Sequence, residues 1–210
     1  IPYEGTFSKI FGGPSTVCGL QGDDILCWNS SGIVEQQSLQ SGLETSYYDV
    51  RWTEMQDFSL YTPYSSELYL DDIADERGWD EVFGSGMTDY VAVLFEGYLY
   101  IELDGTYMFQ LESDDGSMLY IDDELVIDND GTHGNVQVQG NMFLSEGYHK
   151  LRVEYFEDQS IGYMSFRWLD GNSYVSVPSE LFYNGLLSTS VQDISIGADH
   201  LCYVLEDNTF

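Results

Sequence analysis

Alternation of apolar and polar side chains with a period of two is the feature that most constrains how this chain folds. Tyr107, Phe109 and Leu111 share one face of a segment, and residues 150–155 and 162–169 repeat the pattern. Successive side chains of a strand point to opposite faces, so these segments are expected to be strands with one apolar face. Such strands build antiparallel sheets that pack face to face. We therefore predict an all-β fold, an antiparallel β-sandwich.

Glycines between the alternating segments predict tight turns. They are Gly105, Gly116, Gly131, Gly140, Gly147 and Gly171. Residues 60–89 show no sustained period and are rich in Asp and Glu, so we expect long loops there. A short helix near residues 66–77 is the one regular element that we expect within this stretch.

The charge of the chain limits its partners. It carries 37 Asp and Glu against 6 Lys and Arg, a formal net charge of −31. Such a field repels phosphate backbones and anionic membrane surfaces, so we expect no nucleic-acid partner. No stretch is long and apolar enough to span a bilayer, and direct membrane insertion is not expected. The acidity either concentrates divalent cations or serves solubility alone, and composition does not separate these two.

Three cysteines indicate the compartment. Cys18 and Cys27 lie on the two arms of an expected strand–turn–strand, so we predict a disulfide between them and an extracellular location, secreted or on the cell surface. The segment around Cys202 repeats this pattern, which would place its partner just beyond Phe210. Since the chain also begins at Ile1 rather than Met, we expect a segment of a longer protein.

Asp114 and Asp115 are adjacent carboxylates in a Gly-containing turn. Neighbouring side chains of an ordinary strand diverge, so only an unusual backbone would let both bind one hard cation. Without further context, an Asx-type turn that caps a hairpin without a metal is the favoured explanation of the pair. A second acidic pair, Asp122 and Asp123, is expected to be a hairpin turn.

Several motifs occur in the order found in a known family. They are GTYMF at 105–109, SDDGSMLYID at 113–122, LVIDN at 125–129, His133, LSEG at 144–147 and LRVEY at 151–155. This series resembles the protective-antigen domain of bacterial toxins, fungal flocculins, surface adhesins and some glycosidases. The resemblance covers about two thirds of the chain, from residue 42 to residue 183. It implies the same β-sandwich that the alternation predicts.

In the lectin branch of that family, the resemblance implies a cis Asp114–Asp115 peptide whose two carboxylates hold calcium. It also implies ligands from the loop that follows residue 156. We expect the side chain of Asp158 or Gln159 there, with Glu157 next, and the carbonyl groups of Gln159 and Ile161. Two vicinal hydroxyl groups of a sugar would complete the coordination sphere.

The two ends of the chain resemble a different family. Residues 10–13, 18–20 and 27–28, and residues 194–205, resemble repeats of the regulator-of-chromosome-condensation type, which form β-propeller blades. We therefore expect flanking β-hairpins from propeller-like repeats at residues 1–41 and 186–210, with the sandwich at residues 42–185. Two unrelated hairpins packed on the central domain are the alternative.

Nothing in the sequence indicates catalysis. His133, His149 and His200 lie in unrelated segments, and we expect His133 to form structural hydrogen bonds. No serine lies in a nucleophile elbow, and no Gly-rich phosphate loop occurs. We therefore predict that the chain is not an enzyme.

The function that we predict is calcium-dependent carbohydrate binding by a lectin or adhesin domain. Its partners would be glycans with vicinal hydroxyls, and copies of itself or other surface proteins. One alternative is a structural subunit of an extracellular appendage or matrix that makes protein contacts only. Another is a specificity-shaping domain attached to an enzyme elsewhere in the polypeptide.

Overall fold

The computed structural model describes residues 40–78 and 81–184 of the chain, with side chains for residues 41–75 and 81–184. Outside these ranges it describes six strands by their backbone alone. The chain divides into two compact units. Ser41–Asn184 form one unit, and Ile1–Gln40 together with Gly185–Phe210 form the other. The second unit therefore contains both ends of the chain.

The flanking unit contains two antiparallel sheets among its described strands. A four-stranded sheet has the order β1 (Lys9–Gly12), β2 (Val17–Gln21), β3 (Asp24–Asn29) and β4 (Gly32–Gln37). A two-stranded sheet joins β18 (Asp193–Ile196) and β19 (Leu201–Val204). Cys18 and Cys27 are directly opposite each other in the β2–β3 register. Their side chains lie outside the described residues, so the disulfide stays a prediction, as does the resemblance to propeller repeats.

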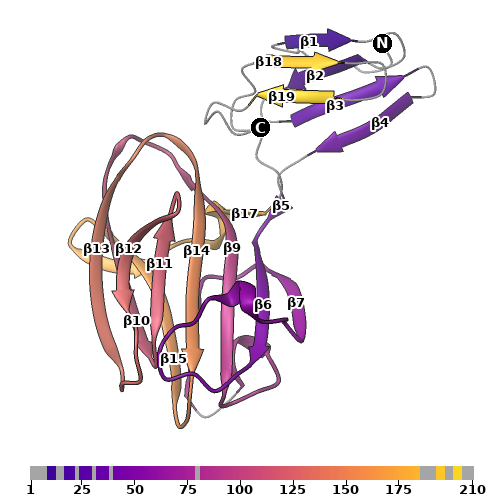
Figure 1. Ribbon diagram of the computed structural model, residues 1–210. Helices are drawn as coiled ribbons and strands as arrows, with labels where there is room; N and C mark the ends of the chain where they lie inside the picture. The colour runs from indigo at the N-terminus through magenta and orange to yellow at the C-terminus, as the bar shows by residue number, and fades with distance from the viewer. Residues whose placement is uncertain are drawn as a thin grey trace. The chain divides into compact units, whose positions relative to one another are not determined.

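The larger unit is an antiparallel β-sandwich, as the alternation predicted (Figure 1). One sheet has the order β13 (Val136–Leu144), β10 (Gly105–Asp114), β15 (Gly162–Asp170) and β16 (Ser173–Ser176), and β8 (Ala74–Gly78) also pairs with β15. We call this five-stranded layer the short sheet.

The second layer has eight strands, and we call it the long sheet. Its main path is β12 (Glu124–Asn129), β11 (Ser117–Ile121), β14 (Gly147–Glu157), β9 (Val91–Ile101), β17 (Phe182–Asn184) and β5 (Gln40–Ser41). In addition, β6 (Leu43–Asp49) pairs with β9, and β7 (Ser65–Tyr69) pairs with β6. The longest pairing, between β14 and β9, lies at the centre of this sheet.

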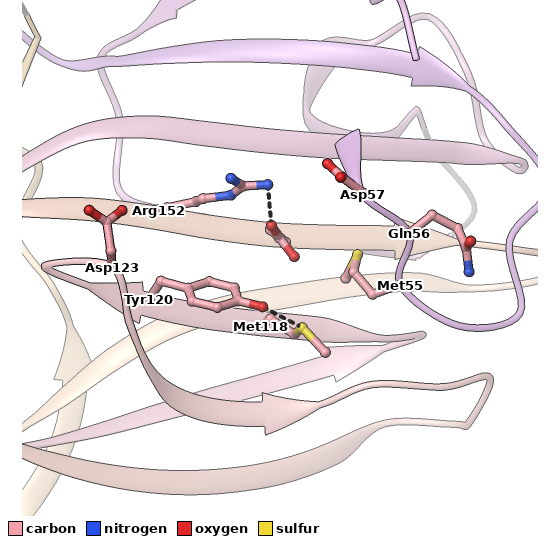
Figure 2. Close-up of a pocket in the computed structure, with 8 residues that line it drawn as sticks. Met55, Gln56, Asp57, Met118, Tyr120, Asp123 and Arg152 are labelled. Carbon is pink, nitrogen blue, oxygen red and sulfur yellow. Dashed lines mark hydrogen bonds and ion pairs between the residues drawn. The ribbon is translucent and has the colours of Figure 1, made fainter. Parts of the chain in front are cut away.

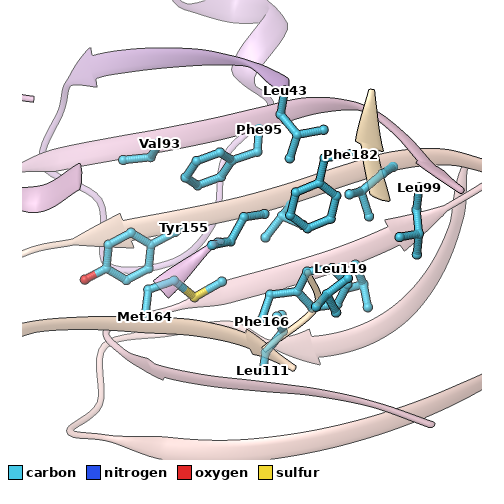
Figure 3. Packing of buried hydrophobic residues seen from close by; sticks show 14 of the residues in the cluster. Leu43, Val93, Phe95, Leu99, Leu111, Leu119, Tyr155, Met164, Phe166 and Phe182 are labelled. Carbon is cyan, nitrogen blue, oxygen red and sulfur yellow. The ribbon is translucent and has the colours of Figure 1, made fainter. Parts of the chain in front are cut away.

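The apolar faces of the two sheets pack together to form the core (Figure 3). Phe109 and Leu111 of β10, and Met164 and Phe166 of β15, are fully buried. They meet side chains of the long sheet such as Leu119, Val153, Phe95 and Phe182. Fully burying an aromatic or aliphatic side chain is worth about 1.5–3 kcal/mol, so this interior drives the fold.

Part of the outer face of the long sheet is also covered by apolar side chains. The sequence had predicted that each strand would have one buried apolar face and one polar face in contact with solvent. A second apolar cluster consists of Tyr48, Trp52, Phe58, Ala92, Leu94 and Phe156. It lies between β9, β14 and the segment that follows β6. Residues 91–95 are therefore all buried, because both faces of that part of β9 are covered.

The prediction of a helix near residues 66–77 was wrong. This region contains β7 and β8, which join edges of the two sheets, and the helices of the described residues are short 3-10 turns. These are η1 (Phe58–Leu60), η2 (Val82–Gly84) and η3 (Ser179–Leu181). The side chains of β7 are mostly exposed, so no apolar alternation indicated a strand. Within the described residues, no helix has the length and apolarity to cross a membrane.

The expected hairpin turn at Asp122 and Asp123 is present between β11 and β12. Both residues have positive φ, 51° and 63°, which is the backbone of a two-residue type I′ turn. Asp122 also accepts hydrogen bonds from His149 Nδ1 (2.6 Å) and from the Lys150 amide (2.9 Å). The turn is thus fixed to the start of β14 by a side chain of its own.

Candidate metal centre

The acidic pair lies where the chain crosses from one sheet to the other. Asp114 ends β10 in the short sheet, and Ser117 begins β11 in the long sheet. The Asp114–Asp115 peptide bond is cis, as the family resemblance implied. Gly116 completes the crossing, where a Cβ atom would lie 2.4 Å from the Phe156 ring. The turn that carries the two carboxylates is therefore packed against the end of β14.

Three carboxylates converge at this crossing. Asp114, Asp115 and Glu157 each place one oxygen so that the three atoms lie within 4.8 Å of one another. Glu157 ends β14 and follows Leu151, Val153 and Tyr155 at the period of two, so its side chain points inward with theirs. Asp115 is 4% exposed and Glu157 is 1% exposed. The centre is thus a buried acidic cluster that opens to solvent on the side of the half-buried Asp114.

Backbone amide groups from two loops hold Asp115 in place. The amide of His133 donates to its Oδ1 at 2.9 Å, and the amide of Asp158 donates to its Oδ2 at 2.8 Å. Among the described residues, the group of mutually close carboxylates includes Glu157 but not Asp158. Asp158 thus contributes its backbone to the centre by orienting Asp115.

Tyr155 lies beneath the cluster and orients it from the core. Its hydroxyl donates to the Asp114 carbonyl at 2.6 Å and lies 3.3 Å from Glu157 Oε2. Burial raises the pKa of Tyr155 well above its ordinary value, so the phenol stays protonated. Gly162 faces this hydroxyl, and a Cβ at that position would come within 3.3 Å of it. The first residue of β15 therefore leaves room for the phenol.

The cluster opposes its own ionisation. Burial, and then the charge of Asp115, raise the pKa of Asp114. Burial also raises the pKa of Asp115, against the effect of its two amide donors. For Glu157, burial and the charges of Asp115 and Asp114 raise the pKa to about 8. Its Oε1 atom is buried and accepts no hydrogen bond in the structure. Three carboxylates in one place, one with an unused oxygen, favour a bound cation.

The loop after β14 forms the rim of the centre. Gln159 donates through its side-chain amide to the Tyr90 hydroxyl, and the Tyr90 amide donates to the Asp158 carbonyl at 3.1 Å. The Arg51 guanidinium lies 3.9 Å from the centre of the Tyr90 ring. Ile161 is 41% exposed. Coordination by the Gln159 and Ile161 carbonyls stays a prediction.

His133 forms structural hydrogen bonds, as expected. Its ring nitrogens lie 2.8 Å from the Gly134 carbonyl oxygen and 3.0 Å from the Asn129 carbonyl oxygen. The ring thereby fixes the loop whose amide binds Asp115. The imidazole itself contacts no carboxylate of the cluster in these hydrogen bonds.

From the sequence, Asp158 and Gln159 were expected ahead of Glu157, and neither Tyr155 nor Tyr90 was expected at the site. The sequence did contain a signal for Glu157, because it lies two residues after Tyr155 and so belongs to the same inward-pointing face of β14. Tyr155 lies in the same series. Tyr90 precedes β9 and has a φ of 60°, a conformation that nothing in the sequence indicated.

Comparison with known proteins identifies the fold. The family model of the PA14 domain, the protective-antigen domain, matches residues 39–179. Among solved structures, the PA14 domain of the antifreeze protein MpAFP is similar with a TM-score of 0.58 at 19% identity, covering 70% of this chain and 92% of that one. No curated protein matches the chain.

Two further similar structures are a sugar-binding domain and a domain in complex with a glycan. A PA14 sugar-binding domain from an RTX adhesin has a TM-score of 0.57 at 16% identity, covering 69% of this chain and 99% of that one. The epithelial adhesin 9 A domain of Candida glabrata, in complex with Galβ1-4GlcNAc, has a TM-score of 0.54 at 13% identity, covering 70% and 90%. At these identities the similarity establishes the fold.

Proposed function

The chain belongs to the PA14 domain family, and from this membership and the three converging carboxylates we propose that it is a calcium-dependent carbohydrate-binding domain. The proposal assigns the protein to secreted or cell-surface adhesins. The solved adhesin domains of the same fold, one described as sugar-binding and one in complex with a glycan, support this assignment.

The observation that carries the proposal is the buried cluster of Asp114, Asp115 and Glu157. Calcium takes six to eight oxygen ligands, and carboxylates are its preferred charged donors in proteins. The donors here are all oxygen, and Glu157 Oε1 is a buried acceptor without a protein partner. Both facts fit a hard cation better than a thiophilic metal. When bound, calcium would supply a positive charge and open coordination positions at the surface.

The sugar would reach the ion from the side of Asp114 and the 158–161 loop. Asp114 is less buried than the other two carboxylates, and Ile161 is exposed on the same loop. Tyr90 provides a half-buried aromatic ring beside Gln159. Two vicinal hydroxyls of a glycan would replace water on the ion, with the rim side chains setting the orientation. Few protein groups surround such a ligand, so the affinity for a monosaccharide should be about millimolar, or about 4 kcal/mol.

The test is a glycan array probed with the protein in calcium and again with a chelator. Asp114→Asn should abolish both the chelator-sensitive signal and the rise in melting temperature that calcium produces, because a ligand of the native state stabilises it by mass action. Asp170→Asn, an exposed position at the end of β15, is the matched control and should retain both.

Calcium that binds at Asp114 without any chelator-sensitive glycan signal would favour the structural rival, a matrix or appendage subunit. A melting shift that Asp114→Asn leaves intact would place the ion elsewhere in the chain and refute the proposed centre.

A further inference from the structure

A groove of about 400 Å³ lies on the outer face of the long sheet, on the opposite face of β11 and β14 from the sandwich core (Figure 2). We call it the outer groove. Its floor is formed by the outward side chains of β11 and β14, one wall by residues 55–57, and the other end by Asp123 of the hairpin turn. Its volume lies within the range of about 300–1,000 Å³ that is typical of small-molecule sites.

The floor is set by strand pairing. Met118 and Tyr120 point outward from β11, since Leu119 and Ile121 between and beyond them are buried in the core. On β14, Glu154 lies directly opposite Met118, and Arg152 lies directly opposite Tyr120. These four side chains therefore form a two-by-two array. An array on two central strands is a rigid support for a ligand.

The charged pair in this floor is built into the protein. The Glu154 side chain is 5% exposed and its Oε1 lies 2.6 Å from Arg152 Nη2. The Arg152 guanidinium also lies 5.9 Å from the ring centres of both Phe58 and Tyr120. Its Nε atom is buried and has no hydrogen-bond partner in the structure. The Arg152 side chain as a whole is 33% exposed, so its guanidinium can meet a further acceptor in the groove.

The wall is held independently of any ligand. The Met55 amide donates to Asp130 Oδ1 at 2.6 Å, and Asp57 caps η1 by accepting from the Ser59 amide at 2.9 Å. Met55 and Met118 add thioether groups, which adapt to irregular apolar surfaces. The groove thus combines apolar surface with charged groups of both signs.

This combination selects the ligand. An anion would meet the carboxylates of Asp57, Asp123 and Glu154 on a chain of net charge −31. A cation would meet the guanidinium of Arg152 in the floor. A neutral ligand rich in hydroxyl groups satisfies both, because each hydroxyl donates to a carboxylate and accepts from arginine.

We propose that the outer groove binds a neutral saccharide ring, independently of calcium and separately from the centre at Asp114. Hydroxyl groups bind Glu154, Arg152 and the Gln56 amide, and the apolar face of the ring packs on Tyr120 and the two methionines. The domain then carries two carbohydrate sites of different chemistry, one that needs a metal ion and one that does not.

Methionine methyl groups provide a direct readout. The chain has six methionines, two of which line the groove, while Met164 is fully buried in the core. Protein with ¹³C-labelled methionine methyls is titrated in chelator with methyl glycosides of glucose, galactose, mannose and N-acetylglucosamine, and with lactose. We expect at least one of these to shift the Met55 and Met118 resonances saturably and to leave Met164 in place.

Four variants define the result. Tyr120→Leu and Glu154→Gln should each weaken this binding about tenfold or more, the loss expected for one contact to a charged or aromatic group. Tyr100→Leu changes the same residue type on the outer face of β9, away from the groove, and should bind as the wild type does. Asp114→Asn should also retain the shifts, even though it abolishes binding at the calcium centre.

Four outcomes would overturn the proposal. In the first, no sugar shifts the Met55 and Met118 methyl resonances. In the second, Tyr120→Leu and Glu154→Gln bind as the wild type does while their Met164 signals stay native. In the third, Asp114→Asn loses the shifts, and in the fourth only a charged probe, spermidine or citrate, saturates them. The third would mean that the shifts depend on the acidic cluster at Asp114 rather than on the outer groove. The fourth would identify an ionic site.

Discussion

Replacing Glu157 with glutamine tests the electrostatics of the proposed metal centre without relying on any ligand. In the calcium-free protein, burial and the two aspartates raise the pKa of Glu157 from 4.5 to about 8. A carboxyl group whose pKa is raised on folding is more easily ionised in the unfolded chain. The stability of the calcium-free protein therefore falls as the pH rises from about 4.5 to about 8 and is level above that range.

The expected change in the free energy of unfolding follows from the size of the pKa shift of Glu157. One pKa unit corresponds to about 1.4 kcal/mol, so the wild type should lose up to about 5 kcal/mol across the whole window and about 3 kcal/mol by pH 7. Glu157→Gln removes the titrating group, and its stability should lack this decrease. Titrating groups outside the cluster contribute equally to both proteins, so the difference between the two isolates the coupled titration of Glu157 with Asp114 and Asp115.

The assay is urea unfolding of the sandwich between pH 5 and pH 9 in chelator, followed by near-ultraviolet circular dichroism. Calcium should remove the decrease in the wild type, since the ion keeps Glu157 ionised, and should stabilise Glu157→Gln much less. Glu102→Gln, at an exposed position, is the control and should behave as the wild type. Parallel pH curves for the wild type and Glu157→Gln in chelator would refute the reasoning.

Three further predictions concern the rest of the fold. The hydrogen bond from His149 to Asp122 in the hairpin turn raises the pKa of His149. This interaction therefore stabilises the folded protein by about 1–2 kcal/mol below pH 6.5, and the stabilisation is lost as the pH rises through the folded-state pKa. His149→Gln should remove this pH dependence from urea unfolding. Gly140→Ala should destabilise the sandwich by about 3 kcal/mol in the same assay, because the new Cβ atom would lie 2.2 Å from the Val126 carbonyl oxygen of β12. Gly105→Ala is the control, since its Cβ atom would meet nothing closer than 3.8 Å and should change the stability little. Peptide mass mapping without reductant should recover Cys18 linked to Cys27, and a link from either to another cysteine would refute that pairing.

The alternation of β10, β14 and β15 was sufficient to predict the sandwich, because strands of one apolar face leave few other ways to bury that face. The pattern did not indicate β7, whose side chains face solvent and whose position depends on hydrogen bonds to β6. Backbone pairing at a sheet edge leaves little trace in side-chain chemistry, so such strands are found only in the structure.

The residues of the proposed metal centre also fall into those that the sequence indicated and those that it did not. Asp114 and Asp115 are visible as adjacent carboxylates, and Glu157 follows from the inward series of β14. The roles of the Asp158 and His133 amides could not be predicted, because every residue carries such an amide and only the folded loops determine which ones point at Asp115.

The first and last strands of the sandwich lie next to each other, and this affects the order in which the chain can fold during synthesis. The Gly42 amide donates to the Phe182 carbonyl at 2.8 Å, so the folded sandwich brings together the two positions from which the flanking segments continue. The flanking unit needs residues from both ends of the chain, and it can be completed only after the last of them leaves the ribosome. Without the sandwich, closing an intervening loop of this length would cost roughly 4 kcal/mol in chain entropy. A sandwich that folds first removes most of that cost, and the nascent flanking unit then assembles as if its two parts were joined by a short turn.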